Sequence, residues 1–261
     1  MYRKSVVAGS FYPASTQALQ NFIEKYKQNE KYAARIIIAP HAGYIFSGPT
    51  AVKTITTSKI SKNVILLGPN HTGLGEKLSV YPTGSWQTPF GDVFINSDIV
   101  DNITGELFKK DTLAHMGEHS LEVMLPILKY IKSDVKIVPI TISHLSKIEC
   151  KRAAEKLNEI AKKYDITILI STDLNHFEDE ETTRVKDSLA IEKILEIDPD
   201  GLYDTVFEKD ISMCGVFPVT IGLYLARLLN LNNAKLIEHT TSAKTSADFR
   251  RVVGYAGILI W

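Results

Sequence analysis

The chain has 261 residues, of which 44% are hydrophobic and 23% are charged, a composition typical of a soluble globular protein. Thirty basic and thirty acidic side chains cancel, so no overall field attracts the protein to nucleic acid or to an anionic membrane. Two cysteines form no disulfide framework, and no long apolar run resembles a signal peptide or a membrane span, so we expect a cytoplasmic protein.

In chain order, the sequence predicts a helix over 15–29, a strand over 34–40, a helix over 48–58 and a strand over 63–69. Segment 78–95 carries Pro, Gly and aromatic residues typical of a β-hairpin insertion. A helix is predicted over 118–131, a strand over 135–142, a helix over 145–164 and a strand over 166–172. Helices over 179–196 and 217–230 and strands over 234–241 and 252–261 complete the pattern.

This order of elements predicts the fold class. Strands that alternate with helices, and that are apolar along their whole length, indicate a mostly parallel sheet covered on both faces. No Pro- or Ser-rich linker and no low-complexity segment divides the chain. We therefore expect one α/β domain over residues 1–261, with a three-layer α/β/α architecture, a mostly parallel central sheet and a β-hairpin insertion.

Three histidines come directly after predicted buried strands. His41 follows IIIAP, His71 follows ILLGPN, and His176 follows ILISTDLN. In open α/β sheets, ligands bind outside the carboxyl ends of the strands. Each histidine alone is equally compatible with a satisfied loop position. The three together favour a common site.

Polar residues beside these histidines are candidates for the same site. Tyr44 lies in HAGYIFSG and offers a hydroxyl group, and Asn70 directly precedes His71. Asp173 stands three residues before His176, where a carboxylate could orient or stabilise an imidazole. The alternative for Asp173 is a helix cap or a turn residue.

Cys214, in ISMCGVFPV, is open to three interpretations: a core residue, a nucleophile or a metal ligand. CGVFPVTIGLYLARLLN reads as a turn entering an apolar helix, with Pro218 acceptable in the first turn. The positive end of a helix dipole favours thiolate, the form that both a nucleophile and a ligand need. Cys150, inside the helical pattern SKIECKRAAEKL, is predicted to be an ordinary core residue.

A further pair of histidines lies four residues apart, at His115 and His119. That spacing can bind a metal on one helix face, but Gly117 lies between them and the predicted helix begins near Glu118. Glu118 and His119 could reach a pocket from the start of that helix, where a carboxylate is also a good capping group.

The remaining histidines give weaker signals. His144 follows the strand VKIVPITI more loosely, and His239 lies within a strand and is expected to be structural. The sequence has no G-x-G-x-x-G, Walker A, G-x-S-x-G or paired C-x-x-C motif. Nucleotide cofactors and serine hydrolase chemistry therefore lose most of their support.

Seven motifs follow one another from about residue 5 to the C-terminus: AGSFYP (8–13), APHAGYIFSG (39–48), LLGPNH (66–71), EHSLE (118–122), STDLNH (171–176), MCG (213–215) and VGYAG (253–257). In these motifs and in their order the sequence resembles the Memo family, whose animal member is described as a mediator of cell motility. Phe46 stands where the family pattern has a tyrosine, which puts one pocket hydroxyl in doubt.

The resemblance implies a fold similar to LigB-type class III extradiol dioxygenases, which use non-haem Fe(II). It implies that His41, His71 and Cys214 bind a divalent transition metal, with the cysteine in place of the dioxygenase carboxylate. It also implies that His176 acts as acid/base, with Asp173 beside it. A thiolate is softer than a carboxylate, so copper and zinc are candidates besides Fe(II).

Three functions remain open from the sequence. The first is a metal-dependent redox enzyme of oxygenase type acting on a small molecule, with Tyr44, Asn70, Glu118 and His119 as substrate-binding or supporting groups. The second is a scaffold protein whose old cleft binds a small anion or a peptide of the phosphotyrosine type. The third is a cysteine hydrolase or transferase in which His176 activates Cys214 and Asp173 orients the imidazole. The resemblance also implies a functional link to AMMECR-type and radical SAM proteins, and leaves the oligomeric state open.

Overall fold

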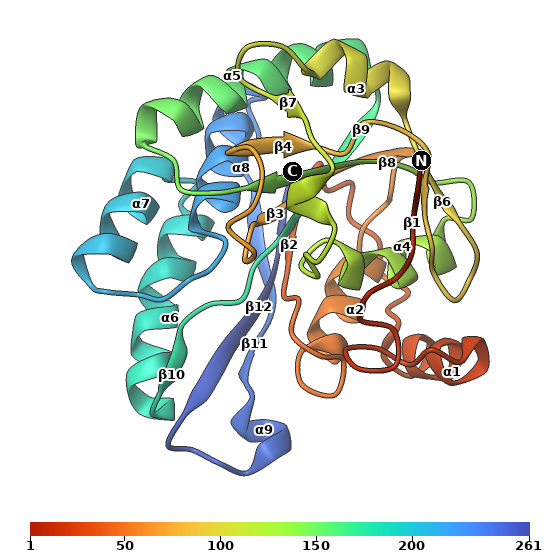
Figure 1. Cartoon of the computed structure of the whole chain (residues 1–261). Coiled ribbons are helices and arrows are strands. Elements are labelled where there is room, and N and C mark those ends of the chain that lie inside the picture. Colours follow the sequence, from red (N-terminus) through yellow and green to blue (C-terminus); the bar gives the residue numbers. More distant parts are fainter.

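A twelve-stranded sheet runs through the centre of the protein (Figure 1). The structure is a computed structural model that describes residues 1–261. The strand order is β1-β5-β6-β8-β3-β9-β2-β12-β10, with β11 beside β12, β4 beside β8 and β7 beside β4. The strands are β1 (Tyr2–Arg3), β2 (Ile36–Ala39), β3 (Asn63–Pro69), β4 (Leu78–Val80), β5 (Ser85–Trp86), β6 (Val93–Ile95), β7 (Lys109–Lys110), β8 (Lys136–Ile142), β9 (Ile166–Ser171), β10 (His176–Glu178), β11 (Ala234–Thr241) and β12 (Val252–Ile260).

The middle of the sheet is parallel, as the sequence predicts. Strands β6, β8, β3, β9 and β2 pair in parallel, whereas β12 joins β2, β11 and β10 in antiparallel fashion. Every residue of β2 and β9 is buried, and so are six of the seven residues of β3 and β8. Their isoleucine, leucine and valine side chains are buried on both faces because helices cover both sides of the sheet.

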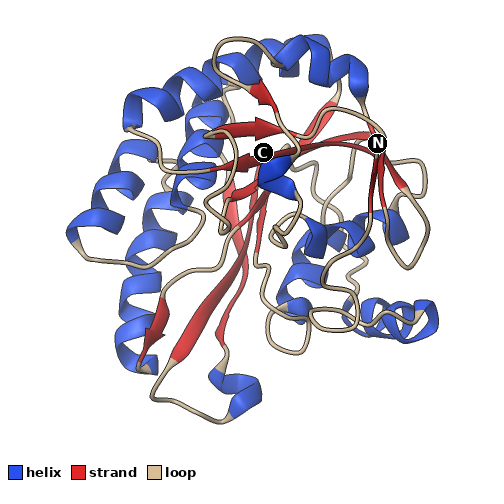
Figure 2. Ribbon diagram, viewed as in Figure 1, coloured by secondary structure: helices blue, strands red, loops and turns tan.

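Two groups of helices form the outer layers and confirm the three-layer fold (Figure 2). In one group, α1 (Thr16–Tyr26), α2 (Gly48–Thr56) and α4 (Leu125–Ile131) contact one another. The other group links α3 (Ser97–Ile103), α5 (Lys147–Lys163), α8 (Val216–Leu228), α7 (Pro199–Glu208) and α6 (Glu180–Leu195) in a continuous series of contacts. A short helix, α9 (Ala243–Ser246), joins β11 to β12. None of the helices has the length and apolar character needed to cross a bilayer.

The prediction of a helix over 118–131 is wrong in its first half. Two 3₁₀ turns, at Leu113–His115 and Glu122–Met124, come before α4, which begins only at Leu125 with Pro126 in its first turn. Buried hydrogen bonds of the Glu118 and Glu122 carboxylates hold the preceding segment in an irregular conformation. The helices α3 and α7 were not predicted.

The hairpin predicted over 78–95 is present in its second half only. Strands β5 and β6 pair antiparallel, with Ser85 opposite Phe94, and they extend the edge of the main sheet. Strand β4 instead pairs with β8 and β7. The sequence pattern of segment 78–95 does not distinguish a hairpin from two strands that pair elsewhere in the sheet, because both consist of short strands between turns.

The register of the parallel strands brings their carboxyl ends to one edge. Ala39 at the end of β2 is paired with Ser171 at the end of β9, and Leu67 in β3 is paired with Ile170. Strand β9 lies between β3 and β2, so the residues that follow these three strands converge.

Candidate metal centre

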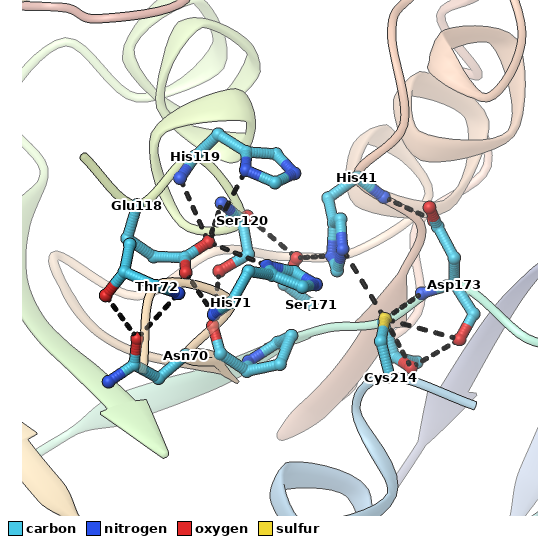
Figure 3. Close-up of polar contacts among 12 residues, drawn as sticks. His41, Asn70, His71, Thr72, Glu118, His119, Ser120, Ser171, Asp173 and Cys214 are labelled. Carbon is cyan, nitrogen blue, oxygen red and sulfur yellow. Dashed lines mark hydrogen bonds and ion pairs between the residues drawn. The ribbon is translucent and has the colours of Figure 1, made fainter. Parts of the chain in front are cut away.

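Three imidazoles gather at this edge of the sheet, from His41, His71 and His119 (Figure 3). One ring nitrogen from each lies within 4.8 Å of the others. The rings of His71 and His119 stack with their centroids 4.8 Å apart, and both present an edge to His41. His41 and His71 follow β2 and β3, as predicted, whereas His119 comes from the irregular segment before α4.

His41 is the most firmly held of the three. Its backbone N–H donates to Asp173 Oδ1 at 2.8 Å, and its Nδ1 lies 2.6 Å from Ser171 Oγ. The Ser171 hydroxyl in turn donates to the Ser120 carbonyl at 2.8 Å. Because that hydroxyl has only one proton, the His41 Nδ1–H must be the donor to Ser171. This leaves the Nε2 lone pair of neutral His41 available to a ligand.

A buried carboxylate fixes His71 in the same way. Glu118 Oε1 lies 2.9 Å from His71 Nδ1, and Glu118 Oε2 accepts the His71 backbone N–H at 2.5 Å. The same carboxylate accepts the backbone N–H groups of His119 and Ser120, each at 2.9 Å. Since an ionised carboxylate only accepts, His71 Nδ1 carries the proton and its Nε2 faces outward. A carboxylate behind a histidine is the usual support of a metal ligand.

The charges of this cluster follow from burial and from Glu118. Burial, together with the nearby imidazoles, lowers the pKa of His41 well below its ordinary value, and burial also lowers the pKa of His119. Burial is the largest single influence on His71 and acts in the same direction, but the hydrogen bond to Glu118 and the charges of Glu118 and Asp173 together outweigh it and raise the His71 pKa. Burial acts to raise the pKa of Glu118, yet its hydrogen bond to His71 and the nearby backbone N–H groups lower it to about 2. The site thus keeps a carboxylate, and neutral His41 and His119 rings.

Cys214 lies on the other side of His41, with Sγ 3.5 Å from His41 Nε2. The Asp173 backbone N–H donates to the sulfur at 3.3 Å. Gly215 is required here, since a Cβ atom on it would lie 2.4 Å from Thr172 Cβ and 2.9 Å from the Ser171 carbonyl oxygen. The first turn of α8 therefore packs directly on the end of β9, and this contact carries Cys214 into the site.

Two expectations about Cys214 are wrong. Burial, reinforced by the charge of Asp173, raises the pKa of its thiol, so the helix dipole does not produce a free thiolate. The imidazole beside the sulfur is that of His41, whereas His176 would have to be there in a cysteine hydrolase of the predicted kind. The arrangement does not support the nucleophile hypothesis in its predicted form.

His176 begins β10 and is held by the loop that leads to Cys214. Its Nδ1 lies 2.8 Å from the Ser212 carbonyl and its backbone N–H donates to Ser212 Oγ at 2.7 Å. A carbonyl only accepts, so Nδ1 carries the proton and Nε2 is the basic nitrogen. Asp173 makes no hydrogen bond to this ring, and its Oδ1 accepts the His41 backbone N–H instead, but the two groups interact through their charges, which is one of the two roles predicted for Asp173. Burial raises the pKa of Asp173. Among the influences that lower this pKa, the charge of His176 is the largest.

Two predicted substrate-binding residues are used by the fold instead. Tyr44 is only 1% exposed, and its hydroxyl donates to the Val123 carbonyl within the core. Asn70 closes its own loop: its amide oxygen accepts from Thr72 and Gly73, and its amide nitrogen donates to the Leu74 carbonyl at 2.7 Å. Neither side chain has free polar atoms directed at the histidines. Glu118 likewise supports His71 from behind, and of these four candidates only His119 lies in the cluster.

The other histidines and the second cysteine have structural surroundings. His115 is buried and its Nε2 lies 3.1 Å from the Ser79 carbonyl, so it forms no metal pair with His119. His144 packs its ring on Phe217. His239 pairs with the buried Asp187 at 2.8 Å, and Cys150 is fully buried, both as expected.

Sequence reasoning missed several supporting residues. Ser171 fixes His41, but as the last residue of an apolar strand it looks like an ordinary strand end. Phe11 packs its ring 4.8 Å from that of His119. Arg3 is buried and donates to the Glu118 carbonyl and to the Glu122 carboxylate, so the N-terminal strand braces the segment that carries His119. Phe11 and His119 lie in the motifs AGSFYP and EHSLE, whereas Arg3 lies outside both, and no local pattern in the sequence predicts either contact.

The donor set fits a divalent transition ion. For metal–nitrogen and metal–sulfur bonds of about 2.1 and 2.3 Å, tetrahedral geometry separates the two donors by about 3.6 Å. The observed 3.5 Å between His41 Nε2 and Cys214 Sγ is close to this separation, and it is also the length of a thiol–imidazole hydrogen bond. The group of ring nitrogens within 4.8 Å of one another comprises His41, His71 and His119 and does not include Cys214. Imidazole and thiolate donors suit iron, copper and zinc better than magnesium or calcium.

Comparison with known proteins gives one consistent family. The sequence profile described as Memo-like protein matches residues 3–259. A MEMO1 family protein of Aquifex aeolicus is 36% identical over 262 aligned positions, and the alignment covers 98% of each chain. MEMO1 family proteins of Sulfurisphaera tokodaii and Thermotoga neapolitana are 38% and 36% identical, with 99% and 100% of both chains covered, respectively.

Proposed function

The chain belongs to the Memo-like protein family, and from its cluster of imidazoles and thiol we propose that it is a metal-dependent redox enzyme of oxygenase type. We take its fold to be similar to that of class III extradiol dioxygenases and its substrate to be a small organic molecule. The observation that carries the proposal is the pair His41 and His71, whose Nδ1 atoms are both engaged, so that both Nε2 atoms are unprotonated and that of His41 lies beside the Cys214 sulfur.

In this proposal His41, His71 and Cys214 bind the metal. Fe(II) is the proposed ion, and the thiolate makes copper and zinc the alternatives. A bound iron or copper ion would supply redox chemistry that no side chain of the cluster provides. Binding would also displace the Cys214 proton, because a coordinating thiol is deprotonated.

The chain's own residues then orient and move protons. Ser171 and Glu118 hold the two imidazoles in the tautomers that ligands need. His176, with Nδ1–H held by the Ser212 carbonyl, presents Nε2 as the group that accepts a substrate proton. Asp173 supports the site by holding the backbone of His41 and, through its own backbone N–H, the sulfur of Cys214.

The proposal is tested on protein purified without oxygen. Metal content is measured first, and oxygen uptake is then followed with a panel of dihydroxylated aromatic compounds. We expect uptake that depends on added Fe(II) or copper, falls at least 100-fold in His41→Ala, and falls at least tenfold in His176→Gln. His144→Gln, a change at an exposed histidine outside the cluster, is the matched control. Equal oxygen uptake by the wild type and His41→Ala would contradict the proposal and favour a binding role for the cleft.

A further inference from the structure

The His119 imidazole has no hydrogen-bond partner, although its side chain is only 25% exposed. Its Nδ1 lies 3.6 Å from Glu118 Oε1, which is beyond hydrogen-bond distance, and its Nε2 makes no contact with a protein acceptor or donor. Its backbone N–H is bound to the same carboxylate at 2.9 Å. One ring nitrogen of His119 lies within 4.8 Å of a ring nitrogen of His41 and of His71, and this grouping points to a ligand shared by all three.

The His119 ring is packed against two other rings, and a quarter of its side chain stays exposed. One face stacks on His71 and another side contacts Phe11, with centroids 4.8 Å away in both cases. Metal–nitrogen bonds of 2.0–2.1 Å require donor nitrogens at most about 4.2 Å apart. The three nitrogens already lie within 4.8 Å of one another, so they need to approach by only about 0.6 Å to reach that limit.

We infer that His119 is a metal ligand and that His41 and His71 belong to two overlapping three-ligand sets. One set is completed by the Cys214 thiolate and the other by the His119 imidazole. Cys214 contacts His41 from one side, and His119 approaches from the side of His71. This inference rests on the metal site of the proposed function and adds a ligand to it.

The two sets differ in the ions they prefer. Thiolate selects soft ions such as Cu(I), whereas an all-imidazole set suits divalent iron, cobalt and zinc. The protein should therefore retain a divalent ion when Cys214 is removed, but lose most of its affinity for Cu(I). A site that depended on Cys214 alone would lose both ions together.

Cobalt(II) alone, added to the full chain without oxygen, is the probe that separates the two sets. Thiolate-bound cobalt absorbs in the near ultraviolet, and its visible bands report the number of ligands. We expect the wild type to show the thiolate band. Cys214→Ser should lose that band, but its cobalt affinity should fall by no more than about 100-fold relative to the wild type. This is the size of loss that follows removal of a residue that only supports a ligand.

Adding His119→Ala to Cys214→Ser should then reduce cobalt affinity by at least a further 100-fold and change the visible bands. If circular dichroism shows that the alanine variant is unfolded, His119→Gln in the Cys214→Ser background replaces it. His144→Gln is the matched control. Unchanged cobalt affinity and visible bands after loss of His119 would overturn the inference. Complete loss of cobalt binding in folded Cys214→Ser would also overturn it while leaving the proposed function intact. A wild type that binds no cobalt would contradict both.

Discussion

Replacement of Glu118 by glutamine tests how the chain prepares the site for a metal. The Glu118 carboxylate is 1% exposed and accepts the His71 Nδ1–H and the backbone N–H groups of His71, His119 and Ser120. A glutamine side chain keeps one acceptor oxygen and replaces the other with an NH₂ donor. The NH₂ group of the glutamine would then face one of the N–H groups that the carboxylate now accepts, and these two donors cannot hydrogen-bond to each other.

The magnitude follows from the pKa of the carboxyl group. Folding lowers the pKa of Glu118 from an ordinary 4.5 to about 2, which corresponds to roughly 3 kcal/mol of folding stability at neutral pH. Because the folded pKa is depressed, this stability is present above pH 4.5 and is lost as the pH falls toward 2. At pH 3 the advantage of the wild type over Glu118→Gln should shrink to about half of its value at neutral pH. Metal affinity should fall about 10–100-fold, since His71 loses its support.

Urea unfolding of the metal-free chain at pH 7 and pH 3, with cobalt titration at pH 7, measures both effects. Glu149→Gln is the control, because Glu149 also has a pKa of about 2 but caps α5 through Ser146, with no contact to the cluster. The control should lose about 1 kcal/mol of stability and no metal affinity. A Glu118→Gln variant with the same stability deficit at pH 3 as at pH 7, or with unchanged cobalt affinity, would refute the reasoning.

Three further predictions concern residues around the site. Gly215→Ala should lower the free energy of unfolding, measured in urea, by about 1–3 kcal/mol, because the new Cβ would meet Thr172. Gly105 has open space around it, so Gly105→Ala should change the free energy of unfolding by less than about 0.5 kcal/mol. Tyr44→Phe should cost about 1–2 kcal/mol through a lost buried hydrogen bond, with unchanged cobalt affinity; a large loss of affinity would return Tyr44 to the site. Burial raises the pKa of the Cys214 thiol, so iodoacetamide at pH 7 should label it more slowly than free cysteine in the metal-free chain, and rapid labelling measured by mass spectrometry would contradict this account.

The positions of His41 and His71 were predictable from the sequence because their strands are apolar to the last residues and parallel strands end at one edge. The same reasoning placed Asp173 near the site, at the end of β9. Its role was not predictable, because the choice between the His41 backbone and the His176 ring depends on the path of one loop.

Side-chain direction explains the other differences. Tyr44 and Asn70 lie within three residues of a site histidine in the sequence, yet core packing turns one inward and loop closure occupies the other. His119 was expected at the start of a helix, and the buried carboxylates beside it give the segment its irregular path instead. Such contacts join residues more than a hundred positions apart, as in the bond from Arg3 to the Glu118 carbonyl, so no local pattern contains them. The role of each residue in metal binding stays a prediction.

Anomalous diffraction from crystals of the anaerobically purified, iron-loaded chain tests the central claim most directly. We predict one strong iron peak, with the Nε2 atoms of His41 and His71 about 2.0–2.2 Å away and Cys214 Sγ about 2.3 Å away. The peak should be absent from crystals of the His41→Ala variant. No peak at the carboxyl ends of β2 and β3 in the wild type, or a peak whose ligands exclude both histidines, would contradict the claim that these strands end in a metal centre.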